Sequence, residues 1–340
     1  MKKLLIASTA LVMVAGAAAA EVKVTGDARM GLSYQETTPA KAPTAAQLNA
    51  VVVADAAVAA AETAFDTTPN TANLDALTAA RATQAAANAA VAAATVPASL
   101  NDWTAEYRVR TKFNLSGKTD SGLGFGASFI VNGTKGVADV TGSSMVWVSG
   151  AWGTVSVGEG VDAGSDSVGL GIADIGYKGI GVDDLAEGLY AATAANINYT
   201  GTFGAITVGL SYDLPVSRTV ANSGDWSLGV AYKGDGFKVA LGYDAGTVNT
   251  LTIGGGVTMG AISANVIYSM PDVGNDAYGL DFGYKLNSAT VITAAYANNG
   301  TDDAYGVGVA YTLGGGAKMV AGLGSVAGVT KAEVGMTFSF

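Results

Sequence analysis

Residues 106–115 read EYRVRTKFNL, and their side chains change character at every step. The odd-numbered positions, which are mostly apolar, are Tyr107, Val109, Thr111, Phe113 and Leu115. The even-numbered positions that follow Glu106 are Arg108, Arg110, Lys112 and Asn114. Because successive side chains of a β-strand point to opposite faces, this stretch predicts a strand with one apolar face and one basic face.

The same period of two recurs along most of the chain. Apolar positions alternate in this way in the stretches 226–232, 237–243, 278–286 and 305–313, and the opposite positions carry Gly, Ala, Ser, Thr, Asp and Lys. A soluble β-sandwich also alternates. Here, however, aromatic residues recur near the ends of the apolar faces, as in membrane-interface girdles, and the opposite faces are small and polar enough to line water.

Sixteen candidate strands follow from this pattern and from the Gly-rich turns between them. They are residues 22–34, 104–116, 122–132, 143–152, 153–160, 195–201, 204–213, 224–233, 236–245, 249–259, 261–269, 276–286, 289–298, 303–313, 316–325 and 330–340. An even number suits a closed antiparallel barrel, and barrels of 16–18 strands leave an aqueous channel. The sequence therefore predicts an all-β, 16-stranded antiparallel transmembrane β-barrel over residues 21–340.

The first twenty residues have the pattern of a secretory signal peptide. Lys2 and Lys3 precede the apolar run Leu4–Ala17, and Ala18–Ala20 offers a small-residue cleavage site before Glu21. Removal of this peptide would change the formal net charge from −10 to −12. No later stretch has the ~20 consecutive apolar residues of a spanning helix, so strands remain the way to cross a membrane.

Residues 36–100 interrupt the strand pattern. They contain 26 alanines and no glycine or tyrosine, although the whole chain has 47 glycines and 14 tyrosines. Helices are expected over Ala45–Phe65 and Asn73–Ala94, with a turn at Asp66–Asn70, because alanine is the best helix former. This segment is therefore expected to be an alanine-rich α-helical hairpin inserted after the first strand.

The composition excludes several classes of function. The chain has no histidine and no cysteine, which removes Ser-His and Cys-His nucleophile pairs, thiolate or imidazole metal sites, and disulfides. Carboxylates and carbonyls could still hold a hard cation such as calcium. An acidic chain with scattered lysines is also a poor nucleic-acid binder. No enzyme and no cofactor are expected.

Several segments resemble one family. The stretch Glu21–Gly31 resembles the mature start of porins from the Rhodobacter group of alphaproteobacteria. Thr119–Leu123 followed by Phe125–Phe129 resembles the second turn and third strand of that family, and Tyr305–Gly308 with Leu313–Ala317 resembles its penultimate hairpin. The last strand, which stops on Phe340, resembles the assembly signal of bacterial outer-membrane proteins. The resemblance does not cover residues 36–100.

The resemblance implies a trimeric general diffusion porin in the outer membrane of a Gram-negative bacterium, in contact with outer-membrane lipid and lipopolysaccharide. In that family the third long loop folds into the barrel and narrows it, and residues 161–194 are the corresponding constriction loop here. The expected acidic side of the constriction is Asp166, Asp174, Asp183, Asp184 and Glu187. The expected basic wall is Arg29, Arg108, Arg110 and Lys112. This arrangement predicts passive diffusion of small hydrophilic solutes and ions with a weak cation preference.

Other interpretations of the same residues stay open. The bases could be solvated away from the constriction, Arg29 could pair with Asp27, and the loop carboxylates could be ordinary surface charges. Asp183, Asp184 and Glu187 could bind calcium, although their spacing is not that of an EF-hand. Tyr177 and Tyr190 are aromatic exceptions within the loop. The rival function is a structural or adhesive barrel whose helical insertion, expected to be extracellular, binds a partner or occludes the pore.

Overall fold

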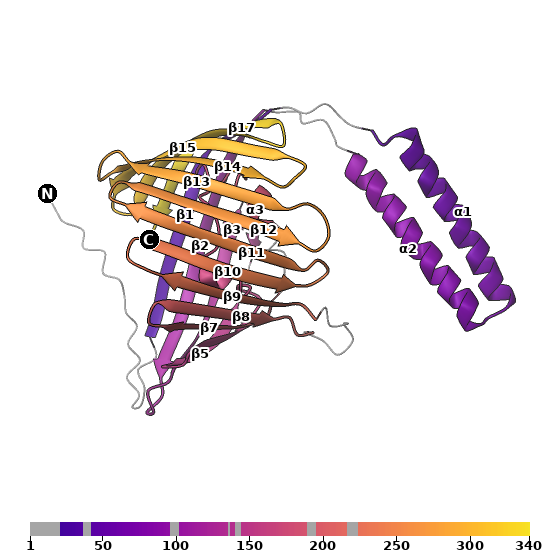
Figure 1. Cartoon of the computed structure of the whole chain (residues 1–340), viewed down its shortest axis with the longest axis horizontal. Coiled ribbons are helices and arrows are strands. Elements are labelled where there is room, and N and C mark those ends of the chain that lie inside the picture. The colour runs from indigo at the N-terminus through magenta and orange to yellow at the C-terminus, as the bar shows by residue number, and fades with distance from the viewer. Residues whose placement is uncertain are drawn as a thin grey trace. The chain divides into compact units, whose positions relative to one another are not determined.

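The computed structural model describes residues 21–36, 42–95, 102–134, 137–139, 144–188, 195–215 and 224–340. The chain forms two compact units (Figure 1). One combines the chain up to Gln35 with Trp103–Phe340, and the other is Glu36–Asp102. The predicted signal peptide lies outside the described residues.

The larger unit is a single antiparallel sheet. Its strands are β1 (Glu21–Gln35), β2 (Trp103–Lys118), β3 (Gly124–Thr134), β4 (Val137–Asp139), β5 (Met145–Gly150), β6 (Gly153–Gly158), β7 (Ile197–Phe203), β8 (Ile206–Tyr212), β9 (Trp226–Lys233), β10 (Phe237–Ala245), β11 (Thr250–Met259), β12 (Ile262–Pro271), β13 (Ala277–Lys285), β14 (Thr290–Asn298), β15 (Asp303–Gly314), β16 (Ala317–Val326) and β17 (Val329–Ser339). Between β6 and β7 lie a 3-10 turn, η1 (Asp166–Val168), and a short helix, α3 (Asp184–Glu187).

The sheet closes on itself. Apart from β4 and β5, which both pair with β3, each strand pairs with its neighbours in sequence, and β1 pairs with both β2 and β17. The three-residue strand β4 pairs with Asn132–Thr134 of β3, and β5 pairs with Gly124–Ser128 of the same strand, so the two share one position in the ring. The ring therefore has sixteen positions, as predicted, and every predicted strand end lies within two residues of the observed one.

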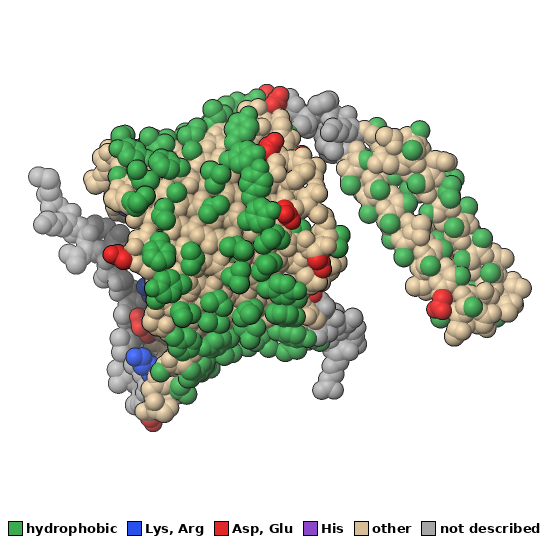
Figure 2. Space-filling model, viewed as in Figure 1, with side chains coloured by type: hydrophobic (Ala, Val, Ile, Leu, Met, Phe, Trp, Pro, Cys, Tyr) green, Lys and Arg blue, Asp and Glu red, His purple; other side chains and the backbone are tan. Residues whose placement is uncertain are grey.

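Alternation along the strands separates an apolar outer face from a polar inner face. Large apolar side chains stay exposed on the outside, for example Tyr107 and Val109 on β2 and Val239 and Leu241 on β10. Figure 2 shows hydrophobic side chains spread over the visible face of the barrel. An apolar surface of this extent is stable against lipid and not against water.

The smaller unit is a helical hairpin of α1 (Ala45–Thr67) and α2 (Thr71–Ala94), whose ends lie within two residues of the predicted ones. Thr44 caps α1 in a capping box with Gln47, and Asn70 caps α2. The buried residues of the hairpin are Ala54, Val58 and Leu77.

Two polar pairs join the helices. Gln84 Nε2 donates to Asp55 Oδ1 at 2.8 Å, and Arg81 forms an ion pair with Glu62 at 3.0 Å. α1 has the length and hydropathy of a membrane-spanning helix. Nevertheless, Asp55 and Glu62 interrupt its apolar run and hold it to α2.

Candidate functional site

Four bases form one patch on the inner face of β1 and β2. The pairs that stand opposite each other in the register are Arg29–Arg108, Asp27–Arg110 and Thr25–Lys112. These positions alternate with the exposed apolar positions of the outer face, so their side chains point inward. The structure thus brings Arg29, Arg108, Arg110 and Lys112 together, and we call these four residues the basic patch.

Asp27 lies within the basic patch, but it does not pair with Arg29. Arg110 Nε donates to both carboxylate oxygens of Asp27 at 3.0 Å, and Arg108 Nη2 donates to Oδ1 at 3.3 Å. The proposed Arg29–Asp27 pair is therefore wrong. Both partners of Asp27 come from the neighbouring strand, because cross-strand neighbours on one face lie closer than residues two apart along one strand.

The loop that follows β6 folds into the barrel. Its backbone hydrogen-bonds to side chains on the inner faces of distant strands: Gly164 to Ser211 of β8 at 3.0 Å, and Ser165 to Ser227 of β9 at 2.7 Å. The described part of the loop, residues 161–188, therefore lies along the inner wall.

Three wall carboxylates anchor this loop. Asp244 of β10 accepts from Ser165 Oγ at 2.7 Å, and Asp281 of β13 accepts from the Ala173 N–H group at 2.8 Å. Glu333 of β17 accepts from the N–H groups of Lys178 and Gly179 at 2.9 and 3.3 Å. All three carboxylates are at most 5% exposed. Hydrogen bonds to ionised groups are stronger than neutral ones, so these contacts fix the course of the loop.

Apolar packing adds to the anchoring. Ile175, Ile180 and Val182 of the loop are at most 2% exposed and belong to one buried cluster with alanines and Ile267 of the wall. Full burial of such a side chain contributes about 1.5–3 kcal/mol each. The loop is therefore a packed part of the barrel interior.

Glycines on the wall make room for the loop. A Cβ atom on Gly242 of β10 would lie 2.8 Å from the Cβ atom of Ser165 and 2.9 Å from Leu170 Cδ1. Likewise, a Cβ atom on Gly335 of β17 would lie 2.9 Å from Tyr177 Cδ1. The glycines of the inner face thus leave space in which the loop packs directly against the wall.

The loop runs across the barrel from the wall formed by β8, β9 and β10 to the edge of the basic patch on β2. In a ring of sixteen positions, β10 and β11 lie opposite β1 and β2, and η1 with Asp166 packs against β8, β9 and β10. At the loop apex, Lys178 Nζ forms an ion pair with Glu106 of β2 at 3.4 Å. Asp166 is therefore across the barrel from the basic patch, whereas the apex lies beside it.

The five predicted loop acids differ in their surroundings. Asp166, Asp174 and Asp184 are exposed, whereas Asp183 and Glu187 are half-buried. Glu187 Oε1 accepts from the Ile172 N–H group at 2.6 Å, so it stabilises the loop itself. Asp174 and Asp183 lie near each other in the loop, and each affects the pKa of the other.

The pKa of several of these carboxyls is raised by partial desolvation against the wall, although the side chains of Asp166 and Asp174 remain exposed over part of their surface. Desolvation, followed by the charge of Asp183, raises the pKa of Asp174 to about 7. Desolvation also raises the pKa of Asp183. The pKa of Asp166 is raised as well, by burial first and by the charge of Asp162 second. Asp174 is therefore the carboxyl of this loop whose pKa lies near neutral pH.

The calcium alternative has no geometric support. Among the described residues, no three acidic side chains form a group that could hold a metal ion. Asp183 lies near Asp174, Glu187 accepts from the backbone of Ile172, and Asp184 lies beside Gly181. The three carboxylates therefore point to different partners.

Tyr177 does not line an open path. It is 6% exposed, and its ring packs against Gly31 and Gly335 on β1 and β17. Burial, followed by the charges of Glu333 and Glu106, raises its pKa to about 12. Tyr177 therefore packs the loop apex against the β1 and β17 wall. Tyr190 lies outside the described residues.

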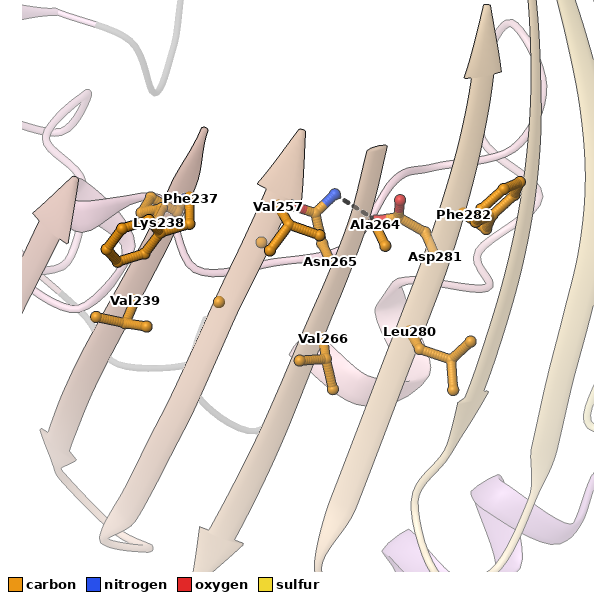
Figure 3. Close-up of a pocket in the computed structure, with 12 residues that line it drawn as sticks. Phe237, Lys238, Val239, Val257, Ala264, Asn265, Val266, Leu280, Asp281 and Phe282 are labelled. Atoms are coloured by element: carbon orange, nitrogen blue, oxygen red, sulfur yellow. Dashed lines mark hydrogen bonds between the residues drawn. The ribbon is translucent and has the colours of Figure 1, made fainter. Parts of the chain in front are cut away.

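A hollow of about 530 Å³ lies on the outer face of the barrel between β10 and β13 (Figure 3). The apolar side chains that line it are Phe237, Val239, Val257, Ala264, Val266, Leu280 and Phe282. Asn265 and Asp281 point the other way, and Asn265 Nδ2 donates to Asp281 Oδ2 at 2.8 Å. This hollow therefore belongs to the apolar exterior and not to the lumen.

A closed 16-position barrel with an inward-folded loop and an apolar exterior is the architecture of a membrane channel. A model of the Gram-negative porin family matches residues 7–330. The chain belongs to that family. This confirms the family resemblance, and it makes the protein a porin channel of the Gram-negative outer membrane and not an enzyme.

Relatives and solved structures agree with this assignment. A porin of Rhodobacter capsulatus is 28% identical over an alignment of 269 residues, which covers 66% of this chain and 88% of the relative. A mutant of the Rh. blastica porin superposes with a TM-score of 0.66 at 20% identity, covering 94% of this chain and 100% of the other. A porin structure refined at 1.8 Å gives a TM-score of 0.61 at 21% identity, with the same coverage. The structural matches support the barrel fold.

The sequence interpretation missed the anchoring residues of this porin. Asp244, Asp281 and Glu333 are single acids on inner faces that otherwise carry small side chains. The glycines that contact the loop are spread over many strands. The sequence signal that could have found them is a carboxylate at an inward position of a strand. Such a group needs a hydrogen-bond donor when it is buried, and the loop inside the barrel can supply one.

Proposed function

We propose that this porin is a general diffusion channel whose constriction lies between the loop 161–194 and the basic patch. The observation that carries the proposal is the placement of Asp166 on the wall opposite β1 and β2, with the loop apex held to β2 by the Lys178–Glu106 ion pair. Exposed acids on one side and bases on the other create a transverse field. Such a field favours dipolar, hydrated solutes over apolar ones.

We further propose that this channel weakly prefers cations over anions. At the end of the barrel where the long loops lie, the described turns carry Asp213, Asp225, Asp272, Asp276 and Asp302. No lysine or arginine occurs among the described residues of those turns, 213–215, 224–225, 246–249, 272–276 and 299–302. An acidic mouth raises the local concentration of cations and opposes the effect of the basic patch.

The assembly and export proposals come from the family. We propose a homotrimer in contact with outer-membrane lipid and lipopolysaccharide, exported by cleavage of residues 1–20. The relatedness to the Rhodobacter capsulatus porin and the apolar exterior of the barrel support these points. N-terminal sequencing of the mature protein tests the cleavage, since it should begin at Glu21.

Single-channel recording in a planar lipid bilayer tests the channel proposal. Detergent-purified protein should give discrete conductance steps, grouped in threes if the trimer is correct. A salt gradient should then give a reversal potential of cation-selective sign. The absence of steps from folded, heat-modifiable protein would contradict an open pore, and a reversal potential of the opposite sign would contradict the cation preference alone.

A further inference from the structure

One tryptophan of the barrel wall faces the lumen. On β5 the exposed residues Val146 and Val148 point to the lipid, so Trp147 between them points inward. Its side chain is half-buried. On the described strands, the other tryptophan, tyrosine and phenylalanine side chains occupy outward positions. Trp147 is therefore an exception to the small, polar character of the inner face.

The indole ring of Trp147 lies over two glycines of β3. Trp147 stands opposite Gly126 in the register of β3 with β5. A Cβ atom on Gly126 would lie 2.5 Å from Trp147 Cζ2, and a Cβ atom on Gly124 would lie 3.4 Å from Trp147 Cζ3. Because a Cβ atom points away from the sheet, these contacts mean that the ring leans across β3 with one face toward the wall. Its other face is turned to the lumen.

The ring borders a hollow of about 480 Å³ on the inner wall. This volume falls within the ~300–1,000 Å³ of typical ligand pockets. Ser116 and Lys118 of β2 and Ser149 of β5 line the hollow with Trp147, and we call these four residues the tryptophan pocket. Lys118 and Ser149 are both paired with Gly124, so they flank the glycine that the ring covers. Glu21 of β1 lies at the far edge of the hollow, paired with Ser116.

The tryptophan pocket lies at the end of the barrel away from the long loops. β2 ends at Lys118, and the short turn 119–123 joins it to β3. The helical insertion and the loop 161–194 leave the barrel at the opposite ends of their strands. Ser116 is four residues beyond Lys112 of the basic patch, which is about 13 Å along β2. With the insertion extracellular, as expected, the pocket faces the periplasmic mouth and is separate from the constriction.

The groups of the tryptophan pocket match a sugar ring. One face of a pyranose presents C–H groups, which pack against the electron-rich face of an indole. Its hydroxyl groups need donors and acceptors, which the Lys118 ammonium and the Ser116 and Ser149 hydroxyls supply. Lys118 and the Glu21 carboxylate have opposite charges, so a neutral ligand suits the hollow better than an ion of either sign. A polyol without a ring would use the hydroxyls and leave the indole face uncovered.

We propose that the tryptophan pocket is a low-affinity subsite for neutral pyranose sugars, in which a sugar stacks on Trp147 during its passage through the channel. The inference rests on the proposed diffusion of hydrophilic solutes through the lumen, and it names a solute class for that diffusion. A half-buried ring covers one face of the sugar only. The sugar therefore leaves again, and diffusion continues.

The noise of the ion current in a planar bilayer tests the proposal. A sugar that binds in the lumen interrupts the current, and the added noise saturates with sugar concentration. Glucose should give this saturating noise with the unmodified porin. Sorbitol, an open-chain polyol with the same number of carbons, should only lower the conductance through viscosity. Glucose added on the periplasmic side should interrupt the current more often than glucose added on the other side, because it reaches the pocket before the constriction.

Variants of the pocket assign the noise to its residues. Trp147→Leu keeps an apolar side chain and removes the ring, so the Kd of glucose from the noise should rise about tenfold, the size of one aromatic contact. Trp226→Leu is the matched control, since Trp226 on β9 faces the lipid, and it should keep the original Kd. Lys118→Met, at the exposed end of β2, is a second variant and should raise the Kd about threefold, as for one hydrogen bond.

Two outcomes would overturn the proposal. One is an equal response of the unmodified porin to glucose and to sorbitol. The other is an unchanged Kd of glucose in both Trp147→Leu and Lys118→Met. Failure of the proposed function looks different, because folded protein would then give no conductance steps even without sugar.

Discussion

The Arg110 Nε–H group donates to both carboxylate oxygens of Asp27, and both distances are 3.0 Å. Asp27 is thereby the acid that partly neutralises the basic patch. The side chains of Asp27 and Arg110 are 40% and 37% exposed, so the pair is hydrated and contributes at most about 1 kcal/mol to stability. Its main effect is on the electrostatic potential of the lumen.

Substitution Asp27→Asn should shift the selectivity of the porin toward anions. The change removes the carboxylate that pairs with Arg108 and Arg110, and it keeps the size of the side chain. We expect the cation-to-anion permeability ratio to fall about twofold, as for one unit charge near the path in water. Arg29→Gln should move the ratio in the opposite direction, since Arg29 stands in the same patch. Reversal potentials that move the same way for both variants would contradict this account.

Substitution Glu333→Gln should loosen the loop apex. Glu333 accepts hydrogen bonds from the N–H groups of Lys178 and Gly179, and a neutral acceptor weakens each bond from about 1.5–3 to about 0.5–1.5 kcal/mol. We expect more open-channel current noise and more frequent substates in single-channel records, with the barrel still folded. Glu21→Gln, at the exposed start of β1, is the matched control and should leave the noise unchanged. Equal noise in both variants would remove Glu333 from its anchoring role.

The barrel was predictable because one local rule governs it. A strand that separates lipid from water must alternate, so each of the sixteen strands could be located from its own residues. The segment 106–115 shows this directly, because the inward position of Arg108 and Arg110 follows from the outward position of Tyr107 and Val109. The helical hairpin was equally local, since alanine content and capping residues determine it.

The contacts inside the barrel were not predictable in the same way. Alternation gives the face of a residue but not which loop atom docks against it. Glu333 lies 155 positions from Lys178, and nothing in either neighbourhood indicates the other. The partner of Asp27 likewise depended on the register of β1 with β2, which a single strand does not reveal.

Substitution Gly242→Val should narrow the pore. A Cβ atom at this position would meet the loop atoms Ser165 Cβ and Leu170 Cδ1 at 2.8 and 2.9 Å, so the loop must move inward. Overpacking of this kind costs about 1–3 kcal/mol, and we expect a lower single-channel conductance. Gly133→Val on β3 is the control, because its Cβ atom would meet only the Val109 carbonyl oxygen, at 3.7 Å. A similar loss of conductance in both variants would show that the loop is not displaced.

Replacement of residues 36–101 by the dipeptide Asn-Gly should leave a folded barrel with unchanged salt conductance. Tyr34 and Trp103 stand directly opposite each other, so a two-residue turn between Gln35 and Asp102 continues the register of β1 and β2. The hairpin is a separate compact unit. None of the hydrogen bonds described for the loop 161–188 involves residues 42–95. The narrowing of the pore should therefore not depend on the insertion.

The same deletion separates the possible roles of the hairpin. Leu48, Val52, Val53 and Leu74 are exposed on it, which leaves apolar surface for a contact outside the barrel unit. If the hairpin packs against a neighbouring protomer, the heat resistance of the trimer on a gel should fall while conductance stays constant. If it restricts solutes at the mouth, entry of larger solutes should rise in liposome-swelling measurements while heat resistance stays constant. A barrel that fails to fold after the deletion would contradict the independence of the two units.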